Sequence, residues 1–312
     1  MVCKFAYSVA IMNPLKPADL HTDPSLFEGM DVYAVAGNPI SHTKSPDIHR
    51  RFAEQAQQKM HYGRLQPDTN AFALAAKSFF DAGGKGMSVT VPFKLDAQVF
   101  ADVLTSRAQL AGAANTLWIK DGKIYGDNTD GAGLVRDLLA QGIAFHQSRI
   151  LLLGAGGAAR GVIGPLLEQS PKCLVIANRS NLKADELVRL FADLAVAKEV
   201  ALESRTLSDL EDSKKTPYPF DLVINATAAG LVDQSPLSIQ ATAHVFVPSS
   251  FAYDMVYGKN TAFMQQALQR GARVSDGLGM LVEQAADAFL MWRGPELATL
   301  IDPRAVLATL RS

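Results

Sequence analysis

The sequence predicts an α/β protein of two domains, in which a C-terminal helix returns to the first domain. Three observations support this expectation. Strand-like and helix-like segments alternate along residues 32–91 and again from residue 150 onward. A hairpin signal over residues 116–126 separates the two series. A strongly apolar helical segment, 278–292, follows the second series and is long enough to pack back on the first domain.

Composition places the chain among soluble globular proteins with a substantial core. It has 312 residues, of which 48% are hydrophobic and 20% are charged. The net charge of −1 offers no basic field to nucleic acid or to an acidic membrane surface. No apolar run reaches about 18 residues, so no membrane span is expected.

Cysteine and histidine usage predicts no metal site. Cys3 and Cys173 stand far apart without a partner motif, so we expect neither a disulfide framework nor a thiolate site, and a cytoplasmic location fits. The spacing of His42, His49 and His61 matches no ligand motif, and we expect loop or packing roles for these three side chains.

Residues 1–29 are expected to form an extension that precedes the first domain. Residues 5–12 are apolar and follow a lysine, as in a signal peptide, but Asn13-Pro14 stands where a small-residue cleavage site would be. We therefore reject a signal peptide. Met30 stands directly before a strand-like run, which favours a working protein that starts at this methionine.

The first series has the pattern strand, helix, strand, helix, strand, although the sequence does not place the middle strand. Turn residues bound the elements, because Gly37-Asn38-Pro39, Gly83-Gly84 and Pro92 interrupt the apolar periodicity. The expected elements are a strand over 32–36, a helix from Pro46 with Ser45 as its N-cap, a helix over 72–80 and a strand over 87–91.

Residues 116–126 predict a β-hairpin. Two β-prone runs flank Asp121-Gly122, which is the signal of a two-residue type I′ turn. Counting outward from the turn pairs Lys120 with Lys123 and sets Asn115 opposite Asn128. The hairpin therefore brings Asn115 and residues 128–130 to its open end.

A second α/β series begins at Ile150. Strands are expected over 150–153, 173–177, 222–225 and 251–255. Helices are expected from the turn after residue 153 to about residue 169, over 183–194, over 278–292 and, as a shorter helix, after Pro303. We expect residues 131–276 to form the second domain. Residues 30–130, joined by residues 277–312, would form the first.

The turn after the strand 150–153 predicts a dinucleotide-binding unit of the Rossmann type. Gly154, Ala155, Gly156, Gly157, Ala158 and Ala159 supply the G-x-G-x-x-G/A pattern between a strand and a helix. The first glycine makes the tight turn, and the second lets the backbone approach a pyrophosphate. The small sixth residue permits close packing of helix on strand, and the helix N-terminus offers free N–H groups to the phosphates.

The end of the next strand favours NADP(H) over NAD(H). NAD-binding units place an acid there to hold the ribose 2′-hydroxyl. Here the strand ends in Asn178-Arg179-Ser180, followed by Lys183, with no acid. An arginine can pair with the 2′-phosphate through two hydrogen bonds. The alternative is that Arg179 is a solvated loop residue.

The first half of the chain carries further chemistry. Thr43 and Ser45 are two residues apart, so in an extended loop both hydroxyls can bind one anion or carboxylate. Lys94 lies just past a strand end, where open α/β sheets bind ligands. Asn115 and Asp130 share the open end of the hairpin. Taken singly, Lys94 could be a solvated charge and Asp130 a helix cap.

Nine motifs, taken in order, make the chain resemble the shikimate dehydrogenase family over nearly its whole length after Met30. They are GNPISHTKSP, SVTVPFK, AGAANTL, GDNTDG, LLLGAGGAARG, NRS, DLVINAT, YDMVY and SDGLGMLVEQA. The resemblance implies reversible NADPH-dependent reduction of 3-dehydroshikimate to shikimate, in aromatic amino-acid biosynthesis. The partner is then a small molecule, with a homodimer left open.

The resemblance also implies site residues. Lys94 and Asp130 would be the catalytic pair. The substrate would be bound by Thr43, Ser45, Thr90, Asn115, Tyr257 and Gln284. The cofactor would be bound by Gly154, Ala155, Gly156, Gly157, Ala158, Asn178, Arg179, Ser180 and Lys183, with Met255 and Gly277 near the nicotinamide.

The sequence departs from the family pattern at three places. Thr43 replaces a serine, which adds a methyl group to the pocket. Lys183 stands where an arginine is usual and gives up bidentate geometry, so the 2′-phosphate would be held less tightly. The loop 258–262 is a residue shorter than usual and lacks a common proline. These differences bear on affinity more than on reaction type.

The proton chemistry fits a coupled pair. A lysine with an ordinary pKa of about 10.4 is a poor base at neutral pH, and an ionised Asp130 beside it would favour the charged form. We therefore assign the proton to the pair Lys94 and Asp130 rather than to either alone. Two alternatives stay open, a quinate/shikimate dehydrogenase of broader specificity and a non-catalytic NADP(H)-binding regulator.

Overall fold

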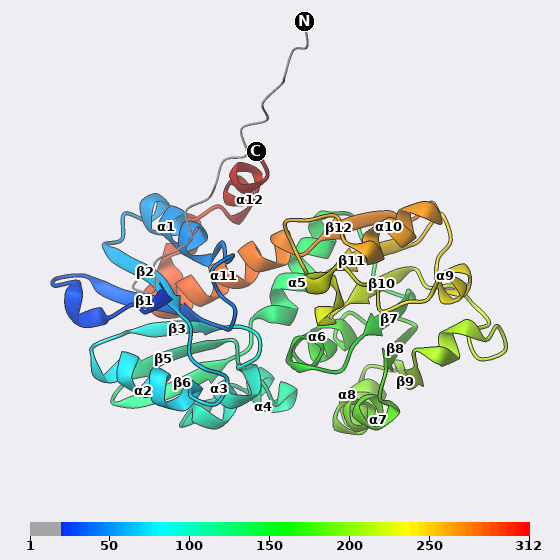
Figure 1. Ribbon diagram of the computed structural model, residues 1–312, viewed down its shortest axis with the longest axis horizontal. Coiled ribbons are helices and arrows are strands. Elements are labelled where there is room, and N and C mark those ends of the chain that lie inside the picture. The colour runs from blue at the N-terminus through cyan, green and yellow to red at the C-terminus, as the bar shows by residue number, and fades with distance from the viewer. Residues whose placement is uncertain (1–19) are drawn as a thin grey trace, which may run out of the picture.

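The computed structural model describes residues 20–312, which form two six-stranded sheets joined by helices (Figure 1). The first sheet has the order β2-β1-β3-β5-β6-β4. Its strands are β1 (Asp31–Ala36), β2 (Met60–Leu65), β3 (Gly86–Val89), β4 (Val103–Leu104), β5 (Thr116–Lys120) and β6 (Lys123–Asp127). Strands β2, β1 and β3 run parallel, and the hairpin β5–β6 joins them antiparallel through β5.

Helices cover both faces of the first sheet. They are α1 (Ser45–Gln55), α2 (Phe72–Asp81), α3 (Lys94–Phe100) and α4 (Ser106–Ala111). Side chains of α2 and α3 pack on the face of β1 that carries Val32 and Ala34. The opposite face of β1 carries Tyr33, which stacks on Trp292 of α11 (Leu278–Arg293).

The second sheet is parallel throughout and has the order β12-β11-β10-β7-β8-β9. Its strands are β7 (Arg149–Leu153), β8 (Cys173–Asn178), β9 (Ala201–Thr206), β10 (Leu222–Asn225), β11 (Phe251–Asp254) and β12 (Arg273–Asp276). The strand order reverses between β7 and β10, which is the place where doubly wound sheets bind dinucleotides.

Helices also sandwich this second sheet. They are α6 (Gly157–Leu167), α7 (Asn181–Leu190), α8 (Ala192–Ala197), α9 (Ile239–Val245) and α10 (Ala262–Gln269). One core lies under α5 (Asp130–Ala140), α6 and α7, and the other lies under α9 and α10.

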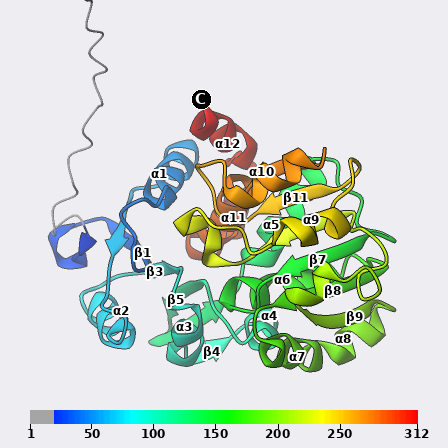
Figure 2. The ribbon, with the colours of Figure 1, turned by 45° about the vertical axis from the view of Figure 1, so that its right-hand side comes forward.

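Helices α5 and α11 pack on each other between the two sheets (Figure 1). Helix α11 also packs on α1 of the first half and on α12 (Pro303–Arg311), which lies beside α1 (Figure 2). The return of the C-terminal helix to the first half is therefore as the sequence predicts. Among residues 20–312, no helix is long and apolar enough to cross a membrane.

Two local predictions are corrected. Ser45 is not the N-cap of α1, because Lys44 already has near-helical angles, φ −91° and ψ −3°, and Ser45 is the first residue of the helix. The strand predicted over 87–91 ends at Val89, where the backbone turns and the N–H of Thr90 donates to Ala36 O at 2.9 Å.

The helix predicted over 183–194 is also different, since it is two helices, α7 and α8, separated at Phe191. The sequence patterns do not locate four of the strands. Strands β4, β9 and β12 are not predicted, and β2 is expected without bounds.

The described part of the predicted extension, residues 20–29, packs along β2. Thr22 and Arg64 exchange backbone and side-chain hydrogen bonds at 2.9 Å, and His21 forms an isolated bridge with Leu65. The Phe27 ring stacks on His61 with a centroid separation of 3.7 Å. The prediction concerning residues 1–19 lies outside the described residues.

Candidate active site

Lys94 and Asp130 meet where the first sheet ends. Each begins a helix that follows a strand, Lys94 at the start of α3 and Asp130 at the start of α5. The Lys94 ammonium donates to Asp130 Oδ2 in an ion pair whose side chains are 12% and 5% exposed. The two opposite charges are therefore held together largely out of contact with water.

Asn115 fixes the carboxylate of this pair. The hairpin has the predicted register, with Lys120 paired to Lys123 and a turn of positive φ at Asp121 and Gly122. At its open end, Asn115 Nδ2 lies 2.9 Å from Asp130 Oδ1. The prediction that the hairpin joins Asn115 to Asp130 is confirmed.

Gln284 and Thr129 complete this buried network. Gln284, on α11, places its Oε1 3.1 Å from Asn115 Nδ2. Thr129 receives a hydrogen bond from Asn115 Nδ2 at 2.9 Å, and its own N–H donates to Asn115 Oδ1 at 2.9 Å. Sequence reasoning did not single out Thr129, although its position beside Asp130 in the polar run after the hairpin was a usable signal.

Thr43, Ser45 and Tyr257 form a second polar cluster. The Thr43 hydroxyl donates to Ser45 Oγ at 3.1 Å, and both residues are buried. Burial raises the pKa of Tyr257, while the Thr43 hydroxyl, the Lys44 N–H and the charge of Arg64 act in the opposite direction. Three hydroxyls from two segments, far apart in the chain, thus lie together.

Thr90 lies against the loop that carries this cluster. A Cβ added at Gly37 would come within 2.5 Å of Thr90 Cγ2, so the two backbones approach closely. Of the six predicted substrate residues, the structure joins Asn115 with Gln284 and Thr43 with Ser45 and Tyr257. Thr90 directly follows β3 and lies beside Gly37, the first residue of the loop between β1 and α1.

The glycine turn has the geometry that the sequence predicts. Gly154 has φ +111°, and a Cβ there would come within 3.2 Å of Ala226 O, so another residue would be strained. A Cβ at Gly156 would meet no atom within 4 Å, which leaves room for a phosphate to approach the backbone. Ala159 is fully buried against the sheet. The turn fits a bound pyrophosphate.

The glycine turn lies directly beside Lys94. A Cβ added at Gly157, the first residue of α6, would be 3.2 Å from Lys94 Cβ. Ala155 and Ala158 lie on either side of the two central glycines. The N-terminus of α6 therefore lies beside the start of α3, which carries the lysine of the Lys94–Asp130 pair.

The end of β8 presents two cations. Asn178 closes the turn, its side chain donating to Ser180 O at 3.0 Å. Arg179 and Lys183 are exposed, and neither forms an ion pair with another residue in the range 20–312. The neighbouring acid Glu186 is bound to Arg160 instead. This donor set fits a phosphate.

Met255 and Gly277 adjoin each other at the same edge of the second sheet. They follow β11 and β12, and a Cβ at Gly277 would be 2.3 Å from Met255 O. Glycine is therefore required at residue 277. Within the described residues, no group of three histidine, cysteine or acidic side chains is placed to hold a metal ion.

Two family descriptions match the chain. "Shikimate dehydrogenase substrate binding domain" matches residues 35–117, and "Shikimate / quinate 5-dehydrogenase" matches residues 137–235. Among curated relatives, "Shikimate dehydrogenase (NADP(+))" of Vibrio atlanticus is 50% identical over 268 residues, 85% of this chain and 92% of that protein. The protein of the same name from Herminiimonas arsenicoxydans is 50% identical over 90% of this chain and 97% of its own length.

Solved structures show the same likeness. The shikimate 5-dehydrogenase of Thermus thermophilus, in complex with NADP(H) and shikimate, is 30% identical, with a TM-score of 0.76 over 90% of this chain and 99% of that one. An Ael1 enzyme from Pseudomonas putida is 43% identical, with a TM-score of 0.75 over 90% of this chain and 98% of the other.

Proposed function

The chain belongs to the shikimate dehydrogenase family, and we propose that Lys94 and Asp130 carry its reaction, the reversible NADPH-dependent reduction of 3-dehydroshikimate to shikimate. One observation carries this proposal. The Lys94–Asp130 ion pair adjoins the glycine turn, with Lys94 Cβ 3.2 Å from where a Cβ of Gly157 would lie. Acid–base groups beside a dinucleotide turn suit the reduction of a carbonyl.

We assign the substrate to the space between the two polar clusters. Thr43, Ser45 and Tyr257 offer hydroxyls to the carboxylate. Asn115 and Gln284, together with Thr90, offer amide and hydroxyl groups to the ring hydroxyls. This division follows from chemistry, because a polyhydroxylated ring acid needs an anion subsite and several neutral hydrogen-bonding partners.

NADP supplies or accepts the hydride at its nicotinamide when it is bound. The pyrophosphate would lie at the residues of the glycine turn, which are Gly154, Ala155, Gly156, Gly157 and Ala158. The 2′-phosphate would be held by Asn178, Arg179, Ser180 and Lys183. Met255 and Gly277 would border the nicotinamide.

The proton belongs to the Lys94–Asp130 pair. In the reducing direction, the Lys94 ammonium is placed to donate a proton to the substrate carbonyl oxygen while Asp130 stabilises its charge. In the oxidising direction, the pair accepts the hydroxyl proton. Asn115 holds Asp130 Oδ1, so the carboxylate keeps its other oxygen for the lysine.

We further propose the division of labour between the two halves. Residues 30–130, with 277–312, would bind the substrate, and residues 131–276 would bind NADP. The paucity of cysteine and the biosynthetic reaction favour work in the cytoplasm.

A coupled assay tests the catalytic pair. Purified protein is offered shikimate or quinate with NADP⁺ or NAD⁺, beside the variants Lys94→Ala and Asp130→Asn. We expect shikimate with NADP⁺ to be preferred, and kcat to fall about 10²- to 10⁴-fold in both variants because an acid–base group is lost. Lys77→Ala is the matched control, since within residues 20–312 this exposed lysine pairs only with Asp81 on α2.

Three outcomes would count against the proposal. Full activity in Lys94→Ala would remove the lysine from the mechanism. A preference for NAD⁺ would overturn the cofactor assignment, and a preference for quinate would move the substrate to the broader-specificity relatives.

A further inference from the structure

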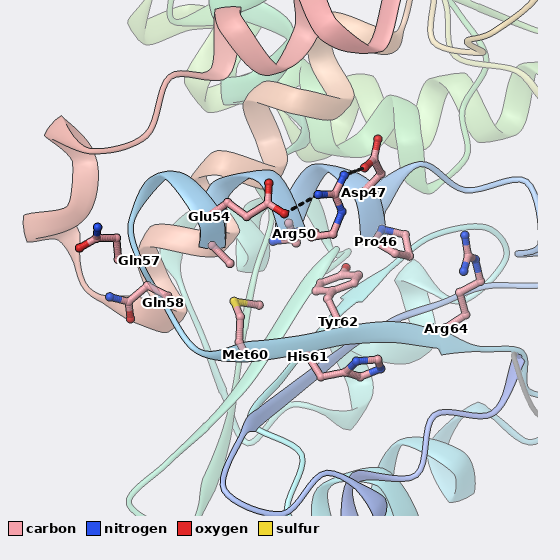
Figure 3. A pocket seen from close by; sticks show the side chains of 12 residues that line it. Pro46, Asp47, Arg50, Glu54, Gln57, Gln58, Met60, His61, Tyr62 and Arg64 are labelled. Atoms are coloured by element: carbon pink, nitrogen blue, oxygen red, sulfur yellow. Dashed lines mark hydrogen bonds and ion pairs between the residues drawn. The ribbon is translucent and has the colours of Figure 1, made fainter.

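Arg64 stands at the end of β2, beside the loop that carries Thr43 and Ser45. Figure 3 shows its side chain rising from the strand near Pro46, at one end of a cavity of about 650 Å³ between α1 and β2. Lys94 and Asp130 do not line this cavity. Arg64 therefore connects the outer cavity with the rear of the proposed carboxylate subsite.

The Arg64 guanidinium is short of partners. Its Nη2 donates to Thr43 O at 3.3 Å, but its Nε is buried and bonds no atom of residues 20–312. Within that same range it forms no ion pair with an acid, unlike Arg50 and Arg51 on α1, which both pair with Asp47. A partly buried cation without an anion is costly, so a counter-charge is expected nearby.

Among residues 20–312, the side-chain hydrogen bond that Arg64 makes to the proposed site goes to Thr43, in the carboxylate subsite. It holds Thr43 by the carbonyl, and the Thr43 hydroxyl reaches Ser45. Its charge acts on Tyr257, lowering the pKa that burial raises. A positive charge thus lies against the Thr43 carbonyl and acts on the Tyr257 hydroxyl.

The backbone of Arg64 is held on two sides. In the sheet it is paired with Val35 of β1. On the outer edge Thr22 accepts from the Arg64 N–H and donates twice to its carbonyl oxygen, all at 2.9 Å. An edge strand fixed in this way can present a charge at a defined place.

We propose that Arg64 is a positioning and specificity-determining residue that selects a carboxylate over a neutral group at the Thr43, Ser45 and Tyr257 subsite. It does so by holding Thr43 from behind and by setting a positive potential at the three hydroxyls. This inference rests on the proposed function, which puts the substrate carboxylate at that subsite.

Two variants separate charge from hydrogen bonding. Arg64→Gln keeps a donor for Thr43 O and loses the charge, whereas Arg64→Lys keeps the charge and loses the planar fork. Each is assayed with shikimate and with its uncharged methyl ester. Arg149→Gln is the matched control, because Arg149 begins β7 in the second sheet and its side chain lies over the Tyr218 ring. Lys44→Gln removes a cation that lies on the loop itself, between Thr43 and Ser45.

We expect Arg64→Gln to raise KM for shikimate about 10- to 50-fold with kcat changed less than about twofold. Its kcat/KM for the methyl ester should match that of the unmodified enzyme. Arg64→Lys should keep most of the preference for the acid, and Arg149→Gln and Lys44→Gln should keep all of it. Thermal melting establishes that each variant is folded.

Several results would overturn the assignment. Arg64→Gln could keep the preference for the acid, or lose activity equally on acid and ester, or Lys44→Gln could lose the preference instead. Failure of the unmodified enzyme to oxidise shikimate is a different result, because it would remove the proposed function itself rather than the role of Arg64.

Discussion

The buried His49 predicts a specific acid sensitivity of the fold. It lies on α1, is fully buried, and stacks on the Tyr62 ring with a centroid separation of 4.1 Å and on Trp292 at 5.2 Å. Neither ring nitrogen has a hydrogen-bond partner among the described residues. Burial lowers the pKa of His49 to about 3.

The direction follows from the two states. In the unfolded chain a histidine has a pKa of about 6.5. Below that pH the unfolded state therefore binds a proton that the folded state does not bind. The contribution of the neutral His49 to the free energy of unfolding is complete above about pH 6.5, and it is lost as the pH falls toward 3. In this range each pH unit lowers the free energy of unfolding by about 1.4 kcal/mol, so the loss between pH 6.5 and pH 5 is about 2 kcal/mol.

The perturbation is His49→Phe, which keeps an aromatic ring in the stack and removes both nitrogens. Urea unfolding at pH 7.5 and pH 5 gives the free energy of unfolding for each protein. We expect the variant to lose about 2 kcal/mol less than the unmodified protein between these pH values. His146→Phe, at an exposed position, serves as the control. An equal loss in His49→Phe and the unmodified protein would refute the reasoning.

Two further predictions concern the cofactor and the N-terminal segment. Arg179→Ala should raise KM for NADP⁺ about tenfold and leave KM for NAD⁺ unchanged, because only NADP⁺ carries the 2′-phosphate, while Arg189→Ala on the exposed face of α7 should change neither. Steady-state kinetics with both cofactors decides this, and an equal effect on both would contradict it. Removal of residues 1–29 takes away the hydrogen bonds of Thr22 to Arg64, so KM for shikimate should rise while KM for NADP⁺ stays the same. Unchanged kinetics in a folded truncated protein would contradict the link.

The sheet interiors could be predicted from the sequence, and the sheet edges could not. All four strands that the patterns miss or do not place are the outermost strands of the two sheets, β2 and β4 in one, β9 and β12 in the other. A central strand is buried on both faces and shows as an apolar run. Edge strands carry polar and charged residues, as Ala201–Thr206 does, and their periodicity resembles that of a loop.

The same distinction applies to the site. The Asn115–Asp130 contact could be predicted because a two-residue turn fixes the register of a hairpin. Pairing residues outward from the turn then sets Asn115 opposite Asn128, close to Asp130. Gln284 and Tyr257 could not be placed by any local rule, since both depend on how α11 and the loop after β11 pack against the first half. Arg64 was missed because its position on an edge strand gives no local signal.

The packing of α5 on α6 ties the proposed catalytic pair to the glycine turn. A Cβ at Gly131 would come within 2.5 Å of Gly161 O, and a Cβ at Gly161 would come within 2.7 Å of Asn128 Oδ1. The two helices can approach so closely only because both residues lack side chains. Asp130 begins α5 one residue before this crossing, and α6 begins at the glycine turn one helical turn before Gly161. The two glycines at this crossing therefore support the geometry of the proposed catalytic site.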